Sequence, residues 1–377
     1  MNDRISPLKK LAAQLATALP AKWRFPVCGV AASVCGREET QPLATSDFAQ
    51  PDARFLQPCA DFLEPGHLSP LALVQSHLVA VEGGIAWSRG AHLTADGRVI
   101  DPISVGMTLS MDQWLVKRQH FFPKVQRVGG TVVSLSTDGH NNYYHWMLDL
   151  LPKLLIALAA GLGNLTFYLG ASLPFQRQTL DLLGIPRERV IDTNVVPFLQ
   201  ADKLIVPFLG QRHPPNVFDA AKCRLLADTF AGLVDTGGEM FDSPARFVIS
   251  RAKTRSRRVV NEAELLERLA PLGFRTIALE NLTLLEQVTL FARAQAIVAS
   301  TGAGLVNLIH ASRGTPVAIL MPEECPDLVC HDIAMFAGLR SAIFHAKPHP
   351  PGTPDRIGCD ILLEDVLLAE LVSYFSR

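Results

Sequence analysis

The chain has little excess charge of either sign. Its 35 lysine and arginine residues nearly balance 36 aspartate and glutamate residues, and charged residues make up 19% of the sequence. Broad attraction to nucleic acid or to an anionic membrane normally needs a clear excess of positive charge. We therefore expect no nucleic acid partner, and any site for an anion must be a local cluster of cations.

Long hydrophobic runs are missing too. The best apolar stretch, residues 154–162, is about half of the roughly 20 residues that a membrane-spanning helix needs. Residues 1–25 carry charges at both ends and lack the continuous apolar segment and small-residue cleavage site of a secretion signal. We expect a cytoplasmic protein without a transmembrane segment, whose contact with a membrane would be peripheral.

Cysteine pairs and metal-ligand spacings are also absent. The seven cysteines form neither CxxC pairs nor zinc spacings, which favours buried free thiols in a reducing compartment and no metal site. They are Cys28, Cys35, Cys59, Cys223, Cys325, Cys330 and Cys359.

What the sequence does contain is a chain of 377 residues, 48% of them hydrophobic, which exceeds the usual size of a single core and predicts two domains. Residues 1–125 predict an irregular α/β lead-in that belongs to the N-terminal domain. Strand and helix patterns then alternate over 126–240 and, after a polar segment, over 241–377. Strands that alternate with helices form parallel, doubly wound sheets, so the expected fold class is α/β with two Rossmann-like domains.

In such folds ligands bind at the carboxyl ends of the strands. The predicted strand 245–250 is followed by a basic run before a helix whose capping signal is Asn261 with Glu264. Guanidinium groups and helix N-termini both favour phosphate oxygens, so the run predicts a diphosphate site. A solvated charge run explains it equally well. The run consists of Arg251, Lys253, Arg255, Arg257 and Arg258.

Small residues follow a later predicted strand, in the segment ASTGAGLVNLIHA. They let the backbone approach a ligand, and the helix after them would present free N–H groups. Gly302, Gly304 and Asn307, with Ala303 between the glycines, have the spacing of a dinucleotide fingerprint that lacks its third glycine. Glu280, after another strand, could bind a ribose or a base, or could simply lie in its loop. Thr283 with Glu286 fits a capping box that opens the next helix.

Three blocks together resemble a known family. NYYHWMLDLLPKL, ISRAKTRSRRVVNEAEL and LENLTLLEQVTLFARAQAIVASTGAGLVNLIHA resemble, in this order and spacing, the domain of glycosyltransferase family 61 over about residues 130 to 325. The resemblance implies an inverting transferase of the GT-B type, whose two Rossmann-like domains face a cleft. It implies a nucleotide-sugar donor on the C-terminal domain, a glycan or lipid-linked saccharide acceptor on the N-terminal side, and no cofactor or metal ion. Where the family has His-Gly-Ala-Gly-Leu this chain has Thr301, whose hydroxyl could donate to a phosphate.

Inverting transfer needs a base for the acceptor hydroxyl and positive charge for the leaving diphosphate. His145 and Asp149 lie four residues apart, hence on one helix face, and are the expected base and its orienting partner in either order. Asn141 and Asn142 could bind sugar hydroxyls or cap the helix, and Tyr144 could stack on a pyranose ring.

Two other functions stay open on the sequence. A catalytically weak relative that only binds a nucleotide sugar or glycan is motivated by Thr301. An NAD(P)-dependent oxidoreductase is motivated by the glycine spacing that begins at Gly302.

Overall fold

The computed structural model of the chain comprises two compact units, residues 1–217 and 218–377. It describes residues 27–29, 77–95, 100, 125–208, 219–231, 243–323, 325, 327–352 and 358–376. Most of the predicted lead-in and the predicted domain boundary near residue 240 lie outside the described residues. The domain limits at 126 and 240 therefore stay predictions.

The first unit is built on a mixed sheet with strand order β1-β2-β8-β5-β6-β7, and the pair β3 and β4 lies beside β8. Strands β8, β5, β6 and β7 run parallel, whereas β2 and β3 are antiparallel to β8. The chain passes outward from β5 to β7 and returns to the other side of β5 with β8, so the switch point of this sheet lies between β5 and β8. The strands are β1 (Val27–Gly29), β2 (His77–Glu82), β3 (Ile85–Trp87), β4 (His92–Leu93), β5 (Gln126–Ser134), β6 (Thr166–Leu169), β7 (Val190–Asp192) and β8 (Phe198–Phe208).

The helix predicted after β5 is present, but it is not one regular helix. It consists of α3 (Tyr143–His145), a π-helical segment η7 (Trp146–Leu150) and α4 (Leu151–Ala159). Pro152 lies in the first turn of α4 and has no N–H to donate to the carbonyl four residues earlier, so a widened turn ahead of it is physically reasonable. The remaining helices of this unit are η8 (Leu162–Asn164), α5 (Pro174–Leu182) and η9 (Arg187–Arg189).

The second unit has a sheet with strand order β10-β9-β11-β12-β13-β14, in which every neighbouring pair except β13 and β14 is parallel. Its switch point lies between β9 and β11, because β10 is added on one side of β9 and the later strands on the other. The α/β class predicted from the sequence is confirmed, since both sheets are rich in parallel pairs. The strands are β9 (Arg246–Ile249), β10 (Phe274–Ile277), β11 (Ala296–Ser300), β12 (Pro316–Pro322), β13 (Arg340–His349) and β14 (Asp360–Leu362).

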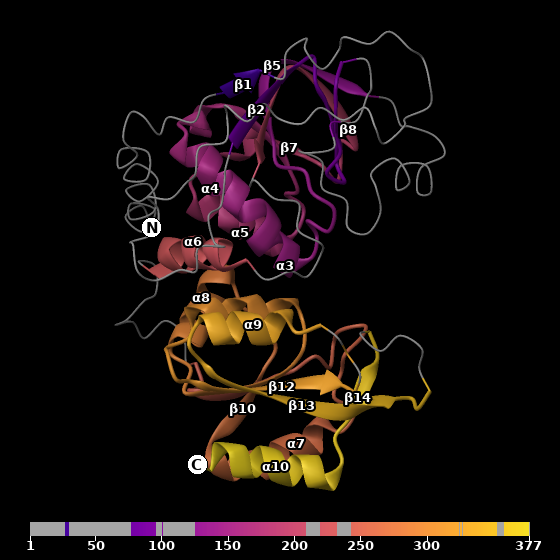
Figure 1. Cartoon of the computed structure of the whole chain (residues 1–377), viewed down its shortest axis with the longest axis vertical. Helices are drawn as coiled ribbons and strands as arrows, with labels where there is room; N and C mark the ends of the chain where they lie inside the picture. The colour runs from indigo at the N-terminus through magenta and orange to yellow at the C-terminus, as the bar shows by residue number, and fades with distance from the viewer. Residues whose placement is uncertain are drawn as a thin grey trace. The chain divides into compact units, whose positions relative to one another are not determined.

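Helices cover both faces of this second sheet, with α7 and α10 on one face and α8 and α9 on the other (Figure 1). The predicted capping box of α8 is confirmed, because Thr283 Oγ1 accepts from Glu286 N at 3.3 Å while Glu286 Oε2 accepts from Thr283 N at 2.7 Å. The helix predicted after β11 is present, as the 3-10 helix η12. The helices are α6 (Ala220–Ala231), α7 (Glu262–Leu269), η10 (Ala270–Leu272), η11 (Leu279–Asn281), α8 (Leu284–Ala292), η12 (Ala303–His310), α9 (Val329–Phe336) and α10 (Asp365–Phe375).

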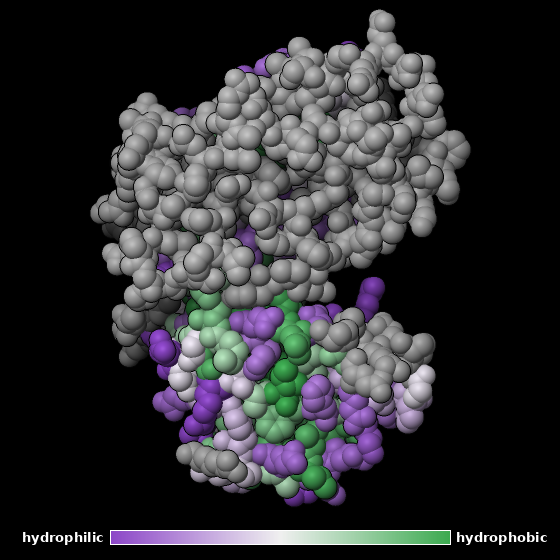
Figure 2. All heavy atoms as spheres, viewed as in Figure 1, coloured by the Kyte–Doolittle hydropathy of each residue, from purple (hydrophilic) through white to green (hydrophobic). Residues whose placement is uncertain are grey.

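Apolar side chains of the second unit are mostly buried between its sheet and helices. Leu265, Leu269, Val298 and Leu371 are 0% exposed and belong to one core cluster under α7 and α10. On the face shown in Figure 2, hydrophilic side chains are interspersed with hydrophobic ones over this unit. Among the described residues, no helix has both the length and the apolar character to cross a membrane.

Candidate functional site

In the first unit, the strand at the switch point leads directly to the predicted catalytic pair. After β5, residues 135–142 form the loop that enters α3, and the Nδ1–H of His145 donates to Asp149 Oδ2 at 2.7 Å. The His145 residue is only 9% exposed, while the Asp149 side chain is 29% exposed. The bond fixes the proton on Nδ1, so Nε2 is the ring nitrogen that can accept another proton.

Gly139 makes room for this imidazole. It has φ +82, in the left-handed region, and a Cβ placed on it would lie 2.7 Å from His145 Cδ2. Tyr144 packs its ring edge-on against the same imidazole, with ring centroids 5.3 Å apart. The position of the His145 ring is therefore set by the turn before α3 as well as by Asp149.

The two asparagines at the helix entrance have partners within the unit. Asn142 is the N-cap, and its Oδ1 accepts from Tyr144 N at 2.9 Å. Asn141 Nδ2 donates to Asn194 Oδ1 at 2.8 Å, and Asn141 Oδ1 accepts from Gln176 Nε2 at 3.2 Å. These bonds give both residues a structural role at the carboxyl edge of the sheet.

Asp192, at the end of β7, anchors this network and was not identified from the sequence. Its oxygens accept from Ser172 Oγ at 2.5 Å and from Asn194 N and Nδ2, both at 2.9 Å. Burial by itself would raise the pKa of Asp192, but the hydrogen bonds from Ser172, Asn194 and Ala171 outweigh it and lower the pKa. An aspartate at a strand end followed two residues later by asparagine was the available sequence signal.

A cavity of about 300 Å³ adjoins Asp192 beside α5 and β7. Because Asp192 holds Asn194, and Asn194 holds Asn141, this cavity is connected through hydrogen bonds to the entrance of α3. It is lined by Ala171, Arg177, Leu180, Asp181, Ile185, Arg187, Val190 and Asp192.

In the second unit, the switch point between β9 and β11 brings together two of the predicted phosphate-binding segments. Arg251 follows β9 and Gly302 follows β11. A Cβ placed on Gly302 would lie 2.6 Å from Arg251 Nη1, so the guanidinium rests directly on this glycine. The φ of Gly302 is 167°, which any residue adopts, and hence contact with the guanidinium rather than backbone conformation demands glycine here.

A second guanidinium from the same loop reaches this edge of the sheet. Arg257 Nη1 donates to Thr301 O at 3.4 Å, while its Nε is buried without a hydrogen-bond partner among the described residues. Burial lowers the pKa of Arg251, the positive charge of Arg257 lowers it further, and Glu280 opposes both. Arg251 and Arg257 therefore repel each other, and Arg257 Nε is a buried donor without an acceptor among the described residues. A bound anion would stabilise this arrangement.

The other residues of the basic run point elsewhere or are exposed. Arg258 donates from N to Asp360 Oδ1 and from Nε and Nη2 to Asp360 Oδ2, at 2.8, 2.9 and 2.6 Å. Lys253 and Arg255 are exposed. Asn261 does not use its side chain to cap α7 and instead binds the backbone of Leu363, through Nδ2 at 2.8 Å and Oδ1 at 3.0 Å.

Thr301 and Asn307 are turned into the unit. Thr301 is 1% exposed, and its hydroxyl donates to Cys330 Sγ at 3.6 Å on α9. Asn307 is 0% exposed and donates from Nδ2 to Gln287 Oε1 at 3.0 Å on α8. The hydroxyl expected near a phosphate therefore already has a partner, and Asn307 has a role in joining η12 to α8.

The glycine spacing has a packing explanation. A Cβ placed on Gly304 would lie 2.6 Å from Leu279 Cδ1, and a Cβ on Gly302 would meet the Arg251 guanidinium in the same way. Ala303 between them begins η12, and Glu280 lies exposed in η11 beside Leu279. Both glycines therefore have packing reasons of their own, so their spacing by itself is no evidence for an NAD(P) site.

Residues 143–318 match the family model described as Glycosyltransferase 61. The matched range begins at α3 and ends within β12, so it contains both the His145–Asp149 pair and the Arg251–Arg257 pair. No curated protein matches the chain. Within the described residues, no group of three or more histidine, cysteine, aspartate or glutamate side chains is arranged to hold a metal ion.

Proposed function

We propose that the chain, whose residues 143–318 match the Glycosyltransferase 61 model, acts as an inverting transferase that uses a nucleotide-sugar donor. In this proposal the second unit binds the donor diphosphate and the first unit binds the hydroxyl of a glycan or lipid-linked saccharide acceptor.

The observation that carries the proposal is the Arg251–Arg257 pair at the switch point of the second sheet. A diphosphate presents several anionic oxygens, and guanidinium groups bind such oxygens with charge-assisted hydrogen bonds. Arg257 Nε has no partner among the described residues, and Arg251 lies over Gly302 at the carboxyl edge where ligands of this fold bind. A bound diphosphate would relieve the repulsion of the two cations and satisfy the buried donor.

The first unit supplies the base. His145 Nδ1–H is held by Asp149, so Nε2 accepts the proton of the acceptor hydroxyl as its oxygen bonds to the anomeric carbon. The bond from that carbon to the phosphate oxygen breaks at the same time, and its electron pair leaves with the nucleoside diphosphate. Asp149 stabilises the imidazolium, and the two arginines stabilise the leaving group. Because the guanidiniums supply this charge, we expect transfer to continue in EDTA.

Binding is tested by thermal shift with UDP-, GDP- and CMP-sugars, NAD(P) and inorganic pyrophosphate at millimolar concentration. We expect a nucleotide sugar and pyrophosphate to raise the melting temperature, and Arg251→Ala and Arg257→Ala to remove both effects. Stabilisation by NAD(P) alone would refute the proposal, as would the failure of every nucleotide sugar to bind.

Catalysis is tested separately by following sugar release and transfer by NMR, which also shows whether the anomeric configuration inverts. His145→Ala should lower the rate by roughly 100- to 10,000-fold, the usual contribution of a general base, while donor binding persists. Asp149→Asn should lower it less, since the imidazole itself remains. Donor binding by the wild-type chain without any release or transfer would instead identify the binding-only relative.

A further inference from the structure

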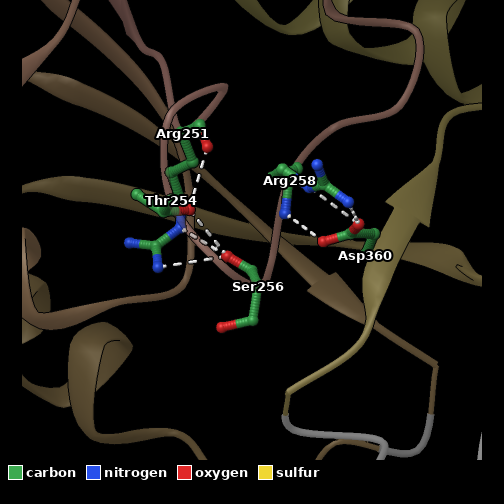
Figure 3. A network of polar contacts seen from close by, with 5 residues as sticks. All are labelled: Arg251, Thr254, Ser256, Arg258 and Asp360. Carbon is green, nitrogen blue, oxygen red and sulfur yellow. Dashed lines mark hydrogen bonds and ion pairs between the residues drawn. The ribbon is translucent and has the colours of Figure 1, made fainter.

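Hydrogen bonds within the loop that carries Arg251 and Arg257 fix the first half of this loop (Figure 3). Arg251 donates from Nε and Nη2 to Ser256 O at 3.3 and 3.2 Å. Thr254 Oγ1 is within hydrogen-bonding distance of the same carbonyl, at 2.9 Å, and of Arg251 O, at 2.8 Å. The carbonyl of Ser256, immediately before Arg257, is thereby held toward the Arg251 side chain.

The second half of the loop is tied to a distant segment of the chain. Asp360 in β14 accepts three hydrogen bonds from the backbone N–H and the guanidinium of Arg258 (Figure 3). Backbone bonds continue this contact, because Ile361 N donates to Arg258 O at 2.8 Å and Val260 N donates to Ile361 O at 2.9 Å. Residue 258 is therefore fixed in position by β14, which lies outside the segment that matches the family model.

Arg257 lies between these two fixed points in a strained conformation. Its φ is +59°, and among the described residues it is the one non-glycine residue with positive φ. A side chain in the left-handed region persists only where the surroundings force it, and such outliers gather at functional sites. In this conformation the Arg257 guanidinium reaches Thr301 O, at the edge where Arg251 also lies.

We propose that Asp360 is a positioning residue for the phosphate site, which by holding Arg258 keeps Arg257 left-handed and directs both guanidiniums at one anion. This inference rests on the proposed donor site. An isolated exposed ion pair contributes little. Asp360 differs because one of its oxygens binds the backbone N–H directly next to Arg257, so its loss frees the backbone of that residue.

The test measures the affinity of the full chain for inorganic pyrophosphate by calorimetry. We expect Asp360→Ala to weaken binding at least tenfold and Asp360→Asn to weaken it less, because an amide oxygen can still accept from Arg258 N. The matched control is Asp365→Ala, which removes another ion pair of this unit, formed with Arg268 Nη2 at 3.0 Å. The control should bind pyrophosphate as the wild-type chain does.

A double-mutant cycle separates positioning from general damage. Arg258→Ala removes the two guanidinium bonds but keeps the backbone N–H that donates to Asp360 Oδ1, so it should weaken pyrophosphate binding less than Asp360→Ala does. The double variant should be no weaker than Asp360→Ala alone. If Asp360→Ala does not fold, Arg258→Ala and Asp360→Asn carry the test. A thermal unfolding curve for each variant checks that the loss of affinity is not a loss of fold.

The outcomes separate this inference from the proposed function. Pyrophosphate binding that is lost in Arg251→Ala but unchanged in folded Asp360 and Arg258 variants overturns the positioning role and leaves the donor site standing. Additive losses in the double variant also overturn it. Absence of pyrophosphate binding by the wild-type chain overturns both.

Discussion

Gly302→Ala should separate anion binding from folding. The φ of Gly302 is 167°, so alanine adds no backbone strain. The new Cβ would lie 2.6 Å from Nη1 and 3.3 Å from Cζ of Arg251, whereas ordinary contact begins at 3.4 Å. The guanidinium must therefore retreat by about 0.8 Å or more from the edge of the sheet.

The expected magnitudes follow from which group moves. The guanidinium is the free end of a flexible side chain, and replacing glycine by alanine reduces the entropy of the unfolded chain, so the free energy of unfolding should change by no more than about 1 kcal/mol. Losing one charge-assisted hydrogen bond to a phosphate costs about 1.5–3 kcal/mol, which is a loss of affinity of roughly 10- to 150-fold.

Gly304→Ala is the matched control, with the same added methyl group two residues away. Its Cβ would lie 2.6 Å from Leu279 Cδ1, an apolar contact without a guanidinium. Overpacking there should lower the free energy of unfolding by about 1–3 kcal/mol and leave pyrophosphate affinity nearly unchanged. Calorimetric titration and urea denaturation of both variants measure the two effects. Wild-type affinity in folded Gly302→Ala would refute the contact between Arg251 and the phosphate.

Gly139→Ala should lower the free energy of unfolding by roughly 1–2 kcal/mol, because the φ of +82° at this position disfavours a side chain, and should slow transfer by displacing the His145 ring. Urea denaturation and initial rates measure the two effects, and an unchanged variant would contradict the turn geometry. Burial raises the pKa of Cys223 to about 12, so iodoacetamide at about pH 8 should label this thiol only after unfolding, and peptide mapping would expose any earlier reaction. Hydrogen bonds from Arg258 lower the pKa of Asp360. The extra stability of the wild-type chain over Asp360→Asn should therefore be constant between about pH 6 and 8 and should vanish as the pH falls well below about 4. A difference in melting temperature that persists in acid would contradict the Asp360–Arg258 ion pair.

The sequence predicted local structure and the order of the elements well. Alternating apolar patterns gave the α/β class, and the Thr283–Glu286 capping box is formed by residues three apart, so no distant contact was needed to recognise it. The spacing of His145 and Asp149 likewise predicted neighbours on one helix face, and the structure brings them to 2.7 Å. Local spacing did not reveal the π-helical segment, which depends on how Pro152 is accommodated.

Residue type and chain position by themselves determined that a basic run follows one strand and that small residues follow another. Only the tertiary structure decided which of these side chains share a site. Parallel pairing of β9 with β11 places Arg251 on Gly302, and β14 removes Arg258 from the same site by pairing it with Asp360, about a hundred residues away. A contact between residues distant in the sequence likewise directs the Thr301 hydroxyl toward Cys330. Strand order and long-range pairing set these directions, and a pattern read along the chain contains no information on them.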